Sequence, residues 1–582
     1  MSGRRSLALL AAAVALEAGL AVHAMRGNSA TFDEGTHLPA GYTHLVLGDH
    51  RLNPEQPPLV KLLAVRPQVR TDDRAWAEAR QWEFGRRFLY RWNDADRLLF
   101  LGRLPMVALA SCLLVAVFLE ARRRFSSGAA PAALGLAALS PDVLAHGALV
   151  TTDIGFALFF FLAVAAFARA LERATPGRVV AAALATGAAF AAKFSAPILL
   201  PVLALGALLG ALGGGPMETA LRGPARPVAG RAARVRHVAL LLGFVAVGTL
   251  IVVWASYGFR AALSPDPAVR AAGRAALEAP APGLVPRAVA AAGNAGLVPE
   301  DYARGFLFVM THSEARRAFL LGELSDAGFP HYFLVTFLLK TPVPLLLLVA
   351  LALGRGPRLA RRDALFLWTP VLVYVAFTLA RGLQIGHRHL LPVYPFLFLA
   401  AGEAASRLWS WRRPVGLVTA LLLGAWYAGG TLRNHPHHLA YFNELAGGPE
   451  NGWRVLVDSN LDWGQDLKRL AVWMRENRVS RIKLSYFGSA QPSYYGIDAE
   501  ALPGYTAPHA THVTREVRPG DVVAVSATHL QGVYVDPEDR ALLARFRGLP
   551  PIGRVGWSIL VYRADFAWPE PFAPPAKDTA GR

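Results

Sequence analysis

The sequence predicts a polytopic α-helical membrane protein with a small α/β domain after its last membrane span. The chain has 582 residues, of which 54% are hydrophobic and 17% are charged, whereas soluble proteins carry about a quarter charged residues. The chain contains many apolar runs whose length is close to the ~18 residues that a helix needs to cross a bilayer. Short basic clusters separate these runs, so membrane topology explains the net charge of +19 better than nucleic-acid binding does.

The apolar runs predict about 11 membrane spans. The first covers residues 7–24 and follows Arg4 and Arg5. We interpret it as an uncleaved anchor, although a basic start, an apolar stretch and a small-residue end are also typical of a signal peptide. The other predicted spans cover residues 100–119, 129–141, 153–171, 178–192, 196–213, 238–257, 331–354, 364–380, 389–405 and 414–432.

Basic loops between the spans indicate the orientation. Five of them are arginine-rich and alternate along the chain, at residues 121–125, 172–178, 222–237, 354–362 and 406–413. If the N-terminus is cytoplasmic, all five lie on the cytoplasmic side, as the positive-inside rule requires. The C-terminus then lies outside.

This topology leaves three large segments outside the membrane, at residues 26–98, 258–330 and 433–582. In the third, residues 464–477 have apolar side chains at helical spacing, with Asp462 as a candidate N-cap. The runs "RIKLSYFG", "DVVAVSATHL" and "WSILVYRADF" are rich in β-branched and aromatic residues, which is typical of strands. We therefore predict a membrane domain over 1–432, an extracytoplasmic α/β domain over 433–565 and a disordered Pro-rich tail over 566–582.

An acid pair, Asp33-Glu34, stands just beyond the first span. Two solvated carboxylates would also explain it, but the sequence that follows favours a site. "NPEQPPL" must turn sharply, because a Pro-Pro pair excludes helix before it. After the turn, Lys61 lies among apolar residues, where an ammonium group either finds an anionic partner or extends to the membrane interface.

A second cation, Arg103, stands where the next apolar helix enters the membrane from outside. One cation from each of two helices can hold a phosphate, Arg as a bidentate donor and Lys as a compact charge. A nearby carboxylate can act as a base. Together these groups suggest glycosyl transfer from a lipid phosphate at the membrane surface.

The same motifs carry a family resemblance. "DEG" after the first span, followed by "QPPLVKLL", resembles motifs of the protein O-mannosyltransferases of glycosyltransferase family 39, in the GT-C superfamily. "AAFAAKFSA", "RHLLPVYPFLFLAAG" and "VLVDSNLDWGQDLKRL" resemble the bacterial branch, which includes aminoarabinose transferases. The resemblance covers about residues 30–500. It implies a GT-C fold and a bacterial inner-membrane location. It also implies an enzyme that transfers a sugar from a polyprenyl-phosphate donor with inversion of the anomeric configuration.

The resemblance also implies roles for single residues. Asp33 would be the catalytic carboxylate, supported by Glu34. Lys61, Arg103 and Arg388 would contact the donor phosphate. Asp153 would match a second acidic position of the family.

Further residues are weaker candidates. Glu55 matches a glutamate that binds zinc in the aminoarabinose transferases, yet no partner histidine can be placed, so no cofactor or metal is firmly implied. Lys340 and Lys193 lie within apolar runs, where an ionisable residue is a functional candidate by default, although extension to the interface also explains them. His387, next to Arg388, is a candidate cavity residue.

The predicted partners are a polyprenyl-phosphate-linked sugar, membrane lipid and an acceptor that is a protein, lipid A or a glycan, with no nucleic acid. The rival interpretation is a transporter or flippase that moves a lipid-linked sugar intact. Transporters often contain internal repeats with broken spans at matching positions, and the sequence has no such repeat. A sensor that acts through its C-terminal domain would leave the first outside segment unexplained.

Overall fold

The computed structural model describes the chain except for residues 1–2, 66–80, 214, 222, 262–270, 272–273, 276, 279, 281, 313–315, 355–360, 380–383, 412–413, 505–511 and 570–582. Within the described part, six helices are long and apolar enough to cross a membrane. They are α1 (Gly3–Arg26), α6 (Ala95–Arg124), α9 (Thr152–Glu172), α12 (Arg231–Ser256), α18 (Arg361–Leu379) and α20 (Val415–Arg433). The predicted polytopic helical fold is confirmed.

The remaining predicted spans also fall on helices, but on shorter or broken ones. α16 (Tyr332–Lys340) and α17 (Val343–Gly354) are long enough to cross a membrane only when taken together, and the chain bends by 114° between them. α7 (Ala129–Ala138), α10 (Pro176–Ala192), α11 (Leu199–Leu212) and α19 (Tyr394–Ser410) have 10 to 17 residues. The predicted count of about 11 spans therefore stays a prediction.

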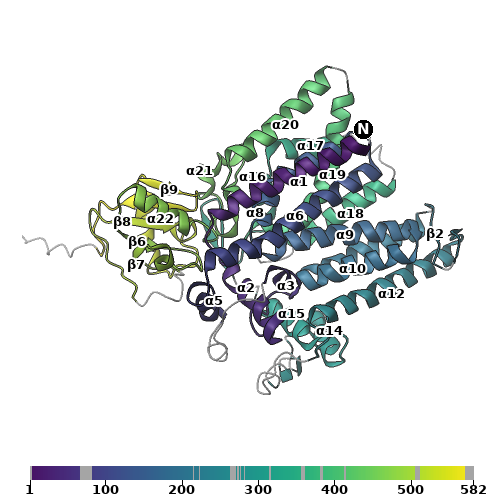
Figure 1. Ribbon diagram of the computed structural model, residues 1–582, viewed down its shortest axis with the longest axis horizontal. Coiled ribbons are helices and arrows are strands. Elements are labelled where there is room, and N and C mark those ends of the chain that lie inside the picture. The colour runs from purple at the N-terminus through teal and green to yellow at the C-terminus, as the bar shows by residue number, and fades with distance from the viewer. Residues whose placement is uncertain are drawn as a thin grey trace, which may run out of the picture.

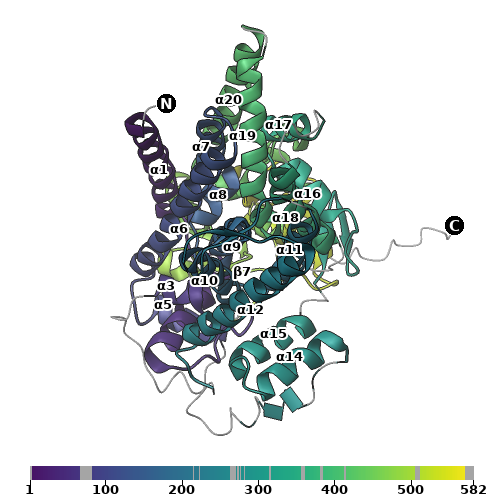
Figure 2. The same ribbon diagram turned by 90° about the vertical axis from the view of Figure 1, so that its right-hand side faces the viewer.

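Small residues let neighbouring helices of the bundle approach closely. A Cβ added at Gly248 of α12 would lie 2.5 Å from the Cβ of Ala183 on α10. A Cβ added at Gly402 of α19 would lie 2.7 Å from the Cβ of Ala133 on α7. These contacts align α9, α10 and α12 on one side of the molecule and α7, α19 and α20 on the other (Figure 2).

The described part of residues 26–98, the first segment predicted to lie outside the membrane, folds back onto the bundle. It contains α2 (Glu34–Tyr42), a π-helical turn (Thr43–Leu47), α3 (Leu59–Ala64) and α5 (Gln81–Tyr90). The predicted turn at Pro57-Pro58 is present, and α3 begins directly after it. A Cβ at Gly41 of α2 would lie 2.4 Å from the carbonyl oxygen of Lys61, so the absent side chain allows α2 and α3 to touch.

The second segment predicted to lie outside the membrane contributes helices and a hairpin. α14 (Leu284–Asn294) packs against α15 (Glu300–His312) at the lower edge of the molecule in Figure 2. β4 (Ala318–Leu320) pairs with β5 (Glu323–Ser325) in an antiparallel hairpin.

A small sheet of β1 (Arg173–Ala174), β2 (Glu218–Thr219) and β3 (Arg226–Pro227) lies at the far end of the bundle from the C-terminal domain (Figure 1).

The C-terminal residues form the expected mix of strands and helices. The sheet has the order β7-β6-β8-β10-β9, in which β7, β6 and β8 are parallel and β8, β10 and β9 are antiparallel. The strands are β6 (Arg481–Ser485), β7 (Asp498–Ala501), β8 (Val522–Ser526), β9 (Gly553–Val555) and β10 (Ile559–Arg563). Its helices include α22 (Leu467–Glu476), α23 (Ala527–Leu530) and α24 (Arg540–Arg547). Central β8 and β10 are buried almost throughout, which explains their continuous hydrophobic sequence.

Two details of this region differ from the sequence prediction or complete it. The predicted N-cap Asp462 is wrong, because α22 begins at Leu467 and follows Asp466. Asp462 is instead buried and accepts a hydrogen bond from the backbone N–H of Thr528 at 3.0 Å. In the predicted tail, Trp568 pairs with Val517, and residues 570–582 lie outside the described part of the chain.

Candidate active site

The adjacent residues Asp33 and Glu34 point to different environments. Asp33 precedes α2 and Glu34 is its first residue. Successive helical side chains are about 100° apart around the axis, because a turn takes ~3.6 residues. The Glu34 side chain is fully buried, whereas that of Asp33 is 27% exposed. The acid pair is therefore split into one structural and one accessible carboxylate.

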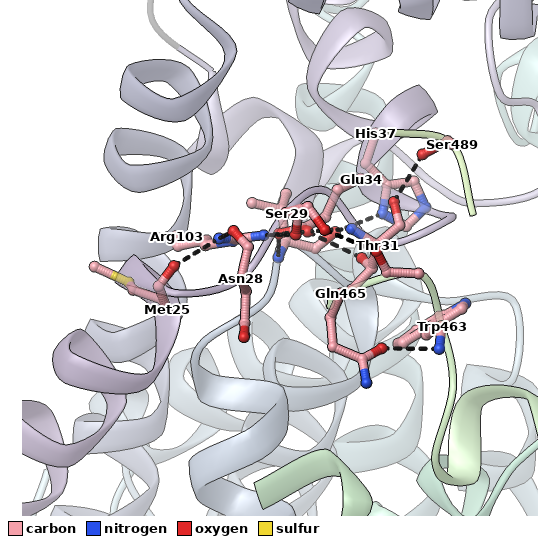
Figure 3. A network of polar contacts seen from close by, with 12 residues as sticks. Met25, Asn28, Ser29, Thr31, Glu34, His37, Arg103, Trp463, Gln465 and Ser489 are labelled. Atoms are coloured by element: carbon pink, nitrogen blue, oxygen red, sulfur yellow. Dashed lines mark hydrogen bonds and ion pairs between the residues drawn. The ribbon is translucent and has the colours of Figure 1, made fainter. Parts of the chain in front are cut away.

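Glu34 forms a buried bidentate ion pair with Arg103 of α6 (Figure 3). Nε and Nη2 of Arg103 donate to the two carboxylate oxygens at 2.8 and 2.7 Å. The backbone N–H of Thr31 and that of Val150 each donate to Glu34 at 2.8 Å. Burial alone would raise the pKa of Glu34, but the ion pair and these hydrogen bonds outweigh it and lower the pKa.

The other Arg103 donors are also used by the protein. Nη1 donates to the carbonyl oxygens of Met25 and Asn28, and Nη2 donates to that of Ser29. Arg103 therefore ties the end of α1 and the start of α2 to α6 (Figure 3). Its guanidinium, 1% exposed, is directed at protein acceptors rather than at open space.

Asp33 belongs to a second cluster, built around Arg388. Nη1 of Arg388 lies 3.1 Å from Oδ2 of Asp33 and 3.4 Å from Oδ2 of Asp153. The second Asp153 oxygen accepts from Nζ of Lys193 at 2.5 Å. The structure thus brings Asp33, Asp153 and Arg388, three residues singled out from the sequence, into one cluster with Lys193.

Residues near the start of the C-terminal region hold Arg388 in place. Nε of Arg388 donates to the hydroxyl of Ser459 at 3.1 Å, and the guanidinium lies 4.2 Å from the ring centroid of Trp463. The Trp463 carbonyl accepts from the backbone N–H of Phe32, next to Asp33. The "DSNLDWGQDL" stretch therefore contacts the residues of the site. The sequence alone indicated mainly a loop and helix start there.

Lys61 lies beside this cluster but contacts no carboxylate among the described residues. Nζ donates to the carbonyl oxygens of Asn53 and Gln56 at 2.9 and 2.7 Å, and the side chain is 1% exposed. Its burial lowers its pKa to about 7, against a smaller opposite effect of Glu55. Gln56, whose carbonyl accepts from Lys61, also accepts from the hydroxyl of Thr152 at 3.5 Å, next to Asp153, so Lys61 lies close to the cluster. Burial lowers the pKa of His37, and Lys61 lowers it further, while Asp33 and Asp153 act in the opposite direction.

The weaker candidates are held by nearby polar groups. Glu55 accepts from the side-chain amides of Asn53 and Gln81. Lys340 donates to the carbonyl oxygens of Leu439 and Asn460. Nε2 of His387 lies 2.6 Å from the hydroxyl of Tyr394 and 3.5 Å from a carboxylate oxygen of Asp142.

Histidine and carboxylate side chains are the usual metal ligands in a site of this kind. In the described ranges, no group of three or more His, Cys, Asp or Glu side chains is arranged to hold a metal ion. The histidines that follow the last span form a chain of ring contacts instead, in which His435 lies 2.6 Å from His23 and 2.9 Å from His438.

Comparison with known families adds to this geometry. Residues 97–215 match the family described as dolichyl-phosphate-mannose-protein mannosyltransferase. The predicted resemblance to this family is confirmed. The matched residues run from α6 to just beyond α11 and include Arg103, Asp153 and Lys193.

Solved structures with similar folds share little sequence with this chain. ArnT from Cupriavidus metallidurans bound to undecaprenyl phosphate is 13% identical; the alignment covers 96% of this chain and 98% of that chain, with a TM-score of 0.46. An Archaeoglobus fulgidus oligosaccharyltransferase tethered with an acceptor peptide is 12% identical; the alignment covers 98% and 75%, with a TM-score of 0.49. The search of curated proteins finds no match.

Proposed function

We propose that this chain is a membrane glycosyltransferase that moves a sugar from a polyprenyl phosphate to an acceptor on the extracytoplasmic face. The observation that carries the proposal is the contact between Asp33 and Arg388. It joins a partly exposed carboxylate to an arginine, next to a segment of the mannosyltransferase family. A carboxylate can take the proton of an acceptor hydroxyl, and an arginine can hold a phosphate.

In this proposal the donor phosphate replaces Asp33 as the main partner of Arg388. A phosphate oxygen is a strong acceptor for a guanidinium, and the Asp153–Lys193 pair keeps the arginine nearby. Asp33 is then free to accept the proton of the acceptor hydroxyl. The acceptor oxygen attacks C1 of the sugar, the bond from C1 to the phosphate oxygen breaks, and polyprenyl phosphate leaves with the electron pair. A single displacement inverts the configuration at C1.

Glu34 and Arg103 support this chemistry without touching the reactants. Because Arg103 already donates to Glu34 and to three backbone carbonyls, we assign it to positioning rather than to the phosphate. The pair fixes the first turn of α2, and with it the place of Asp33. Direct contact with the leaving phosphate then falls to Arg388, while the buried ammonium of Lys61 adds positive charge from nearby.

Lys61 should give donor binding a pH dependence. Its ammonium form attracts phosphate and its neutral amine does not, and its pKa is lowered to about 7. Donor affinity should therefore be highest below pH 7 and fall as the pH rises through that value. In Lys61→Arg the affinity should change little between about pH 6 and 9, because arginine stays charged. The measurement is equilibrium binding of a polyprenyl-phosphate sugar to both proteins across this pH range. If affinity depended on pH in the same way in the parent protein and in Lys61→Arg, the role of Lys61 would be contradicted.

Trp463 should act as a positioning residue, because its ring holds the guanidinium of Arg388. A cation–π contact of this kind contributes about 0.5–2 kcal/mol. Trp463→Ala should therefore lower kcat/KM by roughly 2- to 30-fold, while Trp463→Phe, which keeps an aromatic face, should recover most of the loss. Steady-state kinetics of the purified variants tests this. Equal losses in the two variants would exclude the contact with Arg388 as the cause.

A doubly labelled donor separates the proposed transferase from a flippase. The donor carries ¹⁴C in the sugar and ³²P in the phosphate and is incubated with membranes that contain the full chain. A transferase moves ¹⁴C to the acceptor and leaves ³²P on polyprenyl phosphate. A flippase keeps both labels on one lipid. Transfer of intact lipid across the membrane without separation of the labels would overturn the proposal.

The orientation is proposed on the basis of the arginine-rich loops, and the location on the basis of the family resemblance. The N-terminus is cytoplasmic, the C-terminal domain is extracytoplasmic, and the membrane is a bacterial inner membrane. Asp33, Arg388 and the C-terminal domain then share the outer side. The acceptor is a protein, lipid A or a glycan on that side.

A further inference from the structure

A cavity of about 320 Å³ lies between α9, α11 and α18. Residues directly before β2 help to line it, and β2 lies at the end of the bundle away from the C-terminal domain (Figure 1). It shares no residue with the candidate active site. Its walls are mainly apolar and include Phe167, Val202 and Leu209. Three arginines also line it: Arg124, Arg234 and Arg362.

Arg124 is buried against this cavity with one donor unused. Its side chain is 3% exposed and lies 3.6 Å from the ring centroid of Phe366. Nε and Nη1 donate to Glu120 and Asp363 at 2.9 and 2.8 Å. Nη2 is also buried, yet it has no hydrogen-bond partner within the described ranges. A buried guanidinium donor without an acceptor is costly, so the site would gain from an anionic ligand.

Arg234 and Arg362 add positive charge at the same cavity. Nη2 of Arg234 donates to the carbonyl oxygens of Gly210 and Gly215 at 2.8 Å, and Nη2 of Arg362 donates to that of Pro216 at 3.3 Å. Within the described part of the chain neither arginine forms an ion pair, and Nε of Arg234 is buried without a partner.

The carboxylates at this end are already paired with other arginines. Three carboxylates, on Glu120, Glu172 and Asp363, meet three guanidinium groups, on Arg123, Arg124 and Arg169. These charges balance one another. Glu172 also lines the cavity and interacts electrostatically with Arg362 as well as with Arg123, so the cavity wall carries three arginines against one carboxylate and attracts an anion.

We propose that this cavity binds an anionic membrane phospholipid, with its phosphate at the three arginines and the start of an acyl chain against the apolar walls. Basic pockets between membrane helices bind anionic lipid head groups by this chemistry. A free phosphate would leave the apolar walls unused. The outer surface of α11 exposes Leu205, Leu208 and Leu212, so a chain that leaves the cavity meets an apolar surface. The proposal does not depend on the transferase assignment.

Native mass spectrometry of the purified full chain in detergent tests this site. The probes are phosphatidylglycerol, phosphatidylcholine with the same acyl chains, and undecaprenyl phosphate. We expect phosphatidylglycerol to bind at least tenfold more tightly than phosphatidylcholine. Arg234→Gln together with Arg362→Gln should weaken phosphatidylglycerol about thirtyfold, since each arginine near an anionic lipid contributes roughly a factor of five.

The matched control is Arg236→Gln, which removes an exposed arginine of α12 that does not line the cavity. It should leave phosphatidylglycerol binding unchanged. Equal binding of the two phospholipids, or equal losses in the control and the double variant, would overturn the proposal. Displacement of phosphatidylglycerol by undecaprenyl phosphate at lower concentration would also overturn it, because the occupant would then be the carrier lipid.

Discussion

Asp33→Asn is expected to lower sugar transfer by about 10³-fold or more while the protein still inserts and binds its donor. Loss of a general base typically costs 10²- to 10⁴-fold. Asparagine keeps the size of the side chain but cannot accept the acceptor proton. The variant also removes the anionic partner of Arg388, so donor affinity should stay the same or increase. Transfer and donor binding are measured side by side on purified protein.

A matched control for this variant is Asp96→Asn. Asp96 is a partly exposed carboxylate near the N-terminal end of α6 that pairs with Lys468, and it lies outside the candidate site. It should retain nearly full transfer. If Asp33→Asn kept transfer within tenfold of the parent protein, Asp33 would not be the base. If it lost donor binding together with transfer, its role would be structural.

Arg103→Met is expected to destabilise the protein by about 3–5 kcal/mol, the usual cost of leaving one charge of a buried pair uncompensated. The substitution leaves the fully buried carboxylate of Glu34 without its cation, and it releases the ends of α1 and α2 from α6. Transfer should fall as well, because Asp33 directly precedes α2. Unfolding in detergent, followed by tryptophan fluorescence, gives the change in stability.

Two further variants show whether the pair itself is the cause. Arg97→Met removes an exposed arginine of the same helix and should change stability little. The double variant Glu34→Gln with Arg103→Met buries no unpaired charge, so it should be more stable than Arg103→Met alone. Additive losses in the double variant would contradict a strong Glu34–Arg103 interaction.

The membrane helices were the most predictable part of the fold, because apolar runs of sufficient length determine them directly. In the described part of the chain, each predicted span falls on one helix or on two consecutive helices, from residues 7–24 in α1 to residues 414–432 in α20. The 114° bend between α16 and α17 was not predicted. The apolar run continues through it, although Pro342 and Pro344 stand at the break.

The candidate site was predictable in its residues but not in their pairing. Asp33 and Glu34 are adjacent in sequence, and only the helix that begins between them sends one to Arg388 and the other to Arg103. Arg103 was expected to face a phosphate because its position relative to the span end is visible in the sequence. Its carbonyl acceptors belong to the end of α1 and the turn that follows, more than 70 residues away, and no local pattern reveals them.

The contribution of Ser459 and Trp463 was harder still to predict. They lie more than 70 residues beyond Arg388 and in the region that follows the last predicted span. Their sequence has the composition of a loop and helix start, so local propensity carries no sign of a contact with the membrane domain. Lys193 was recognised only as an ionisable residue in an apolar run, and its partner Asp153 lies 40 residues earlier.

The central claim is that the donor phosphate binds Arg388 in place of Asp33. A cryo-electron microscopy structure of the full chain with polyprenyl phosphate tests it directly. We expect a phosphate oxygen within hydrogen-bond distance of the Arg388 guanidinium and the Asp33 carboxylate free of it, facing the side from which an acceptor would approach. A phosphate bound elsewhere, with the Asp33–Arg388 contact intact, would contradict the proposed mechanism.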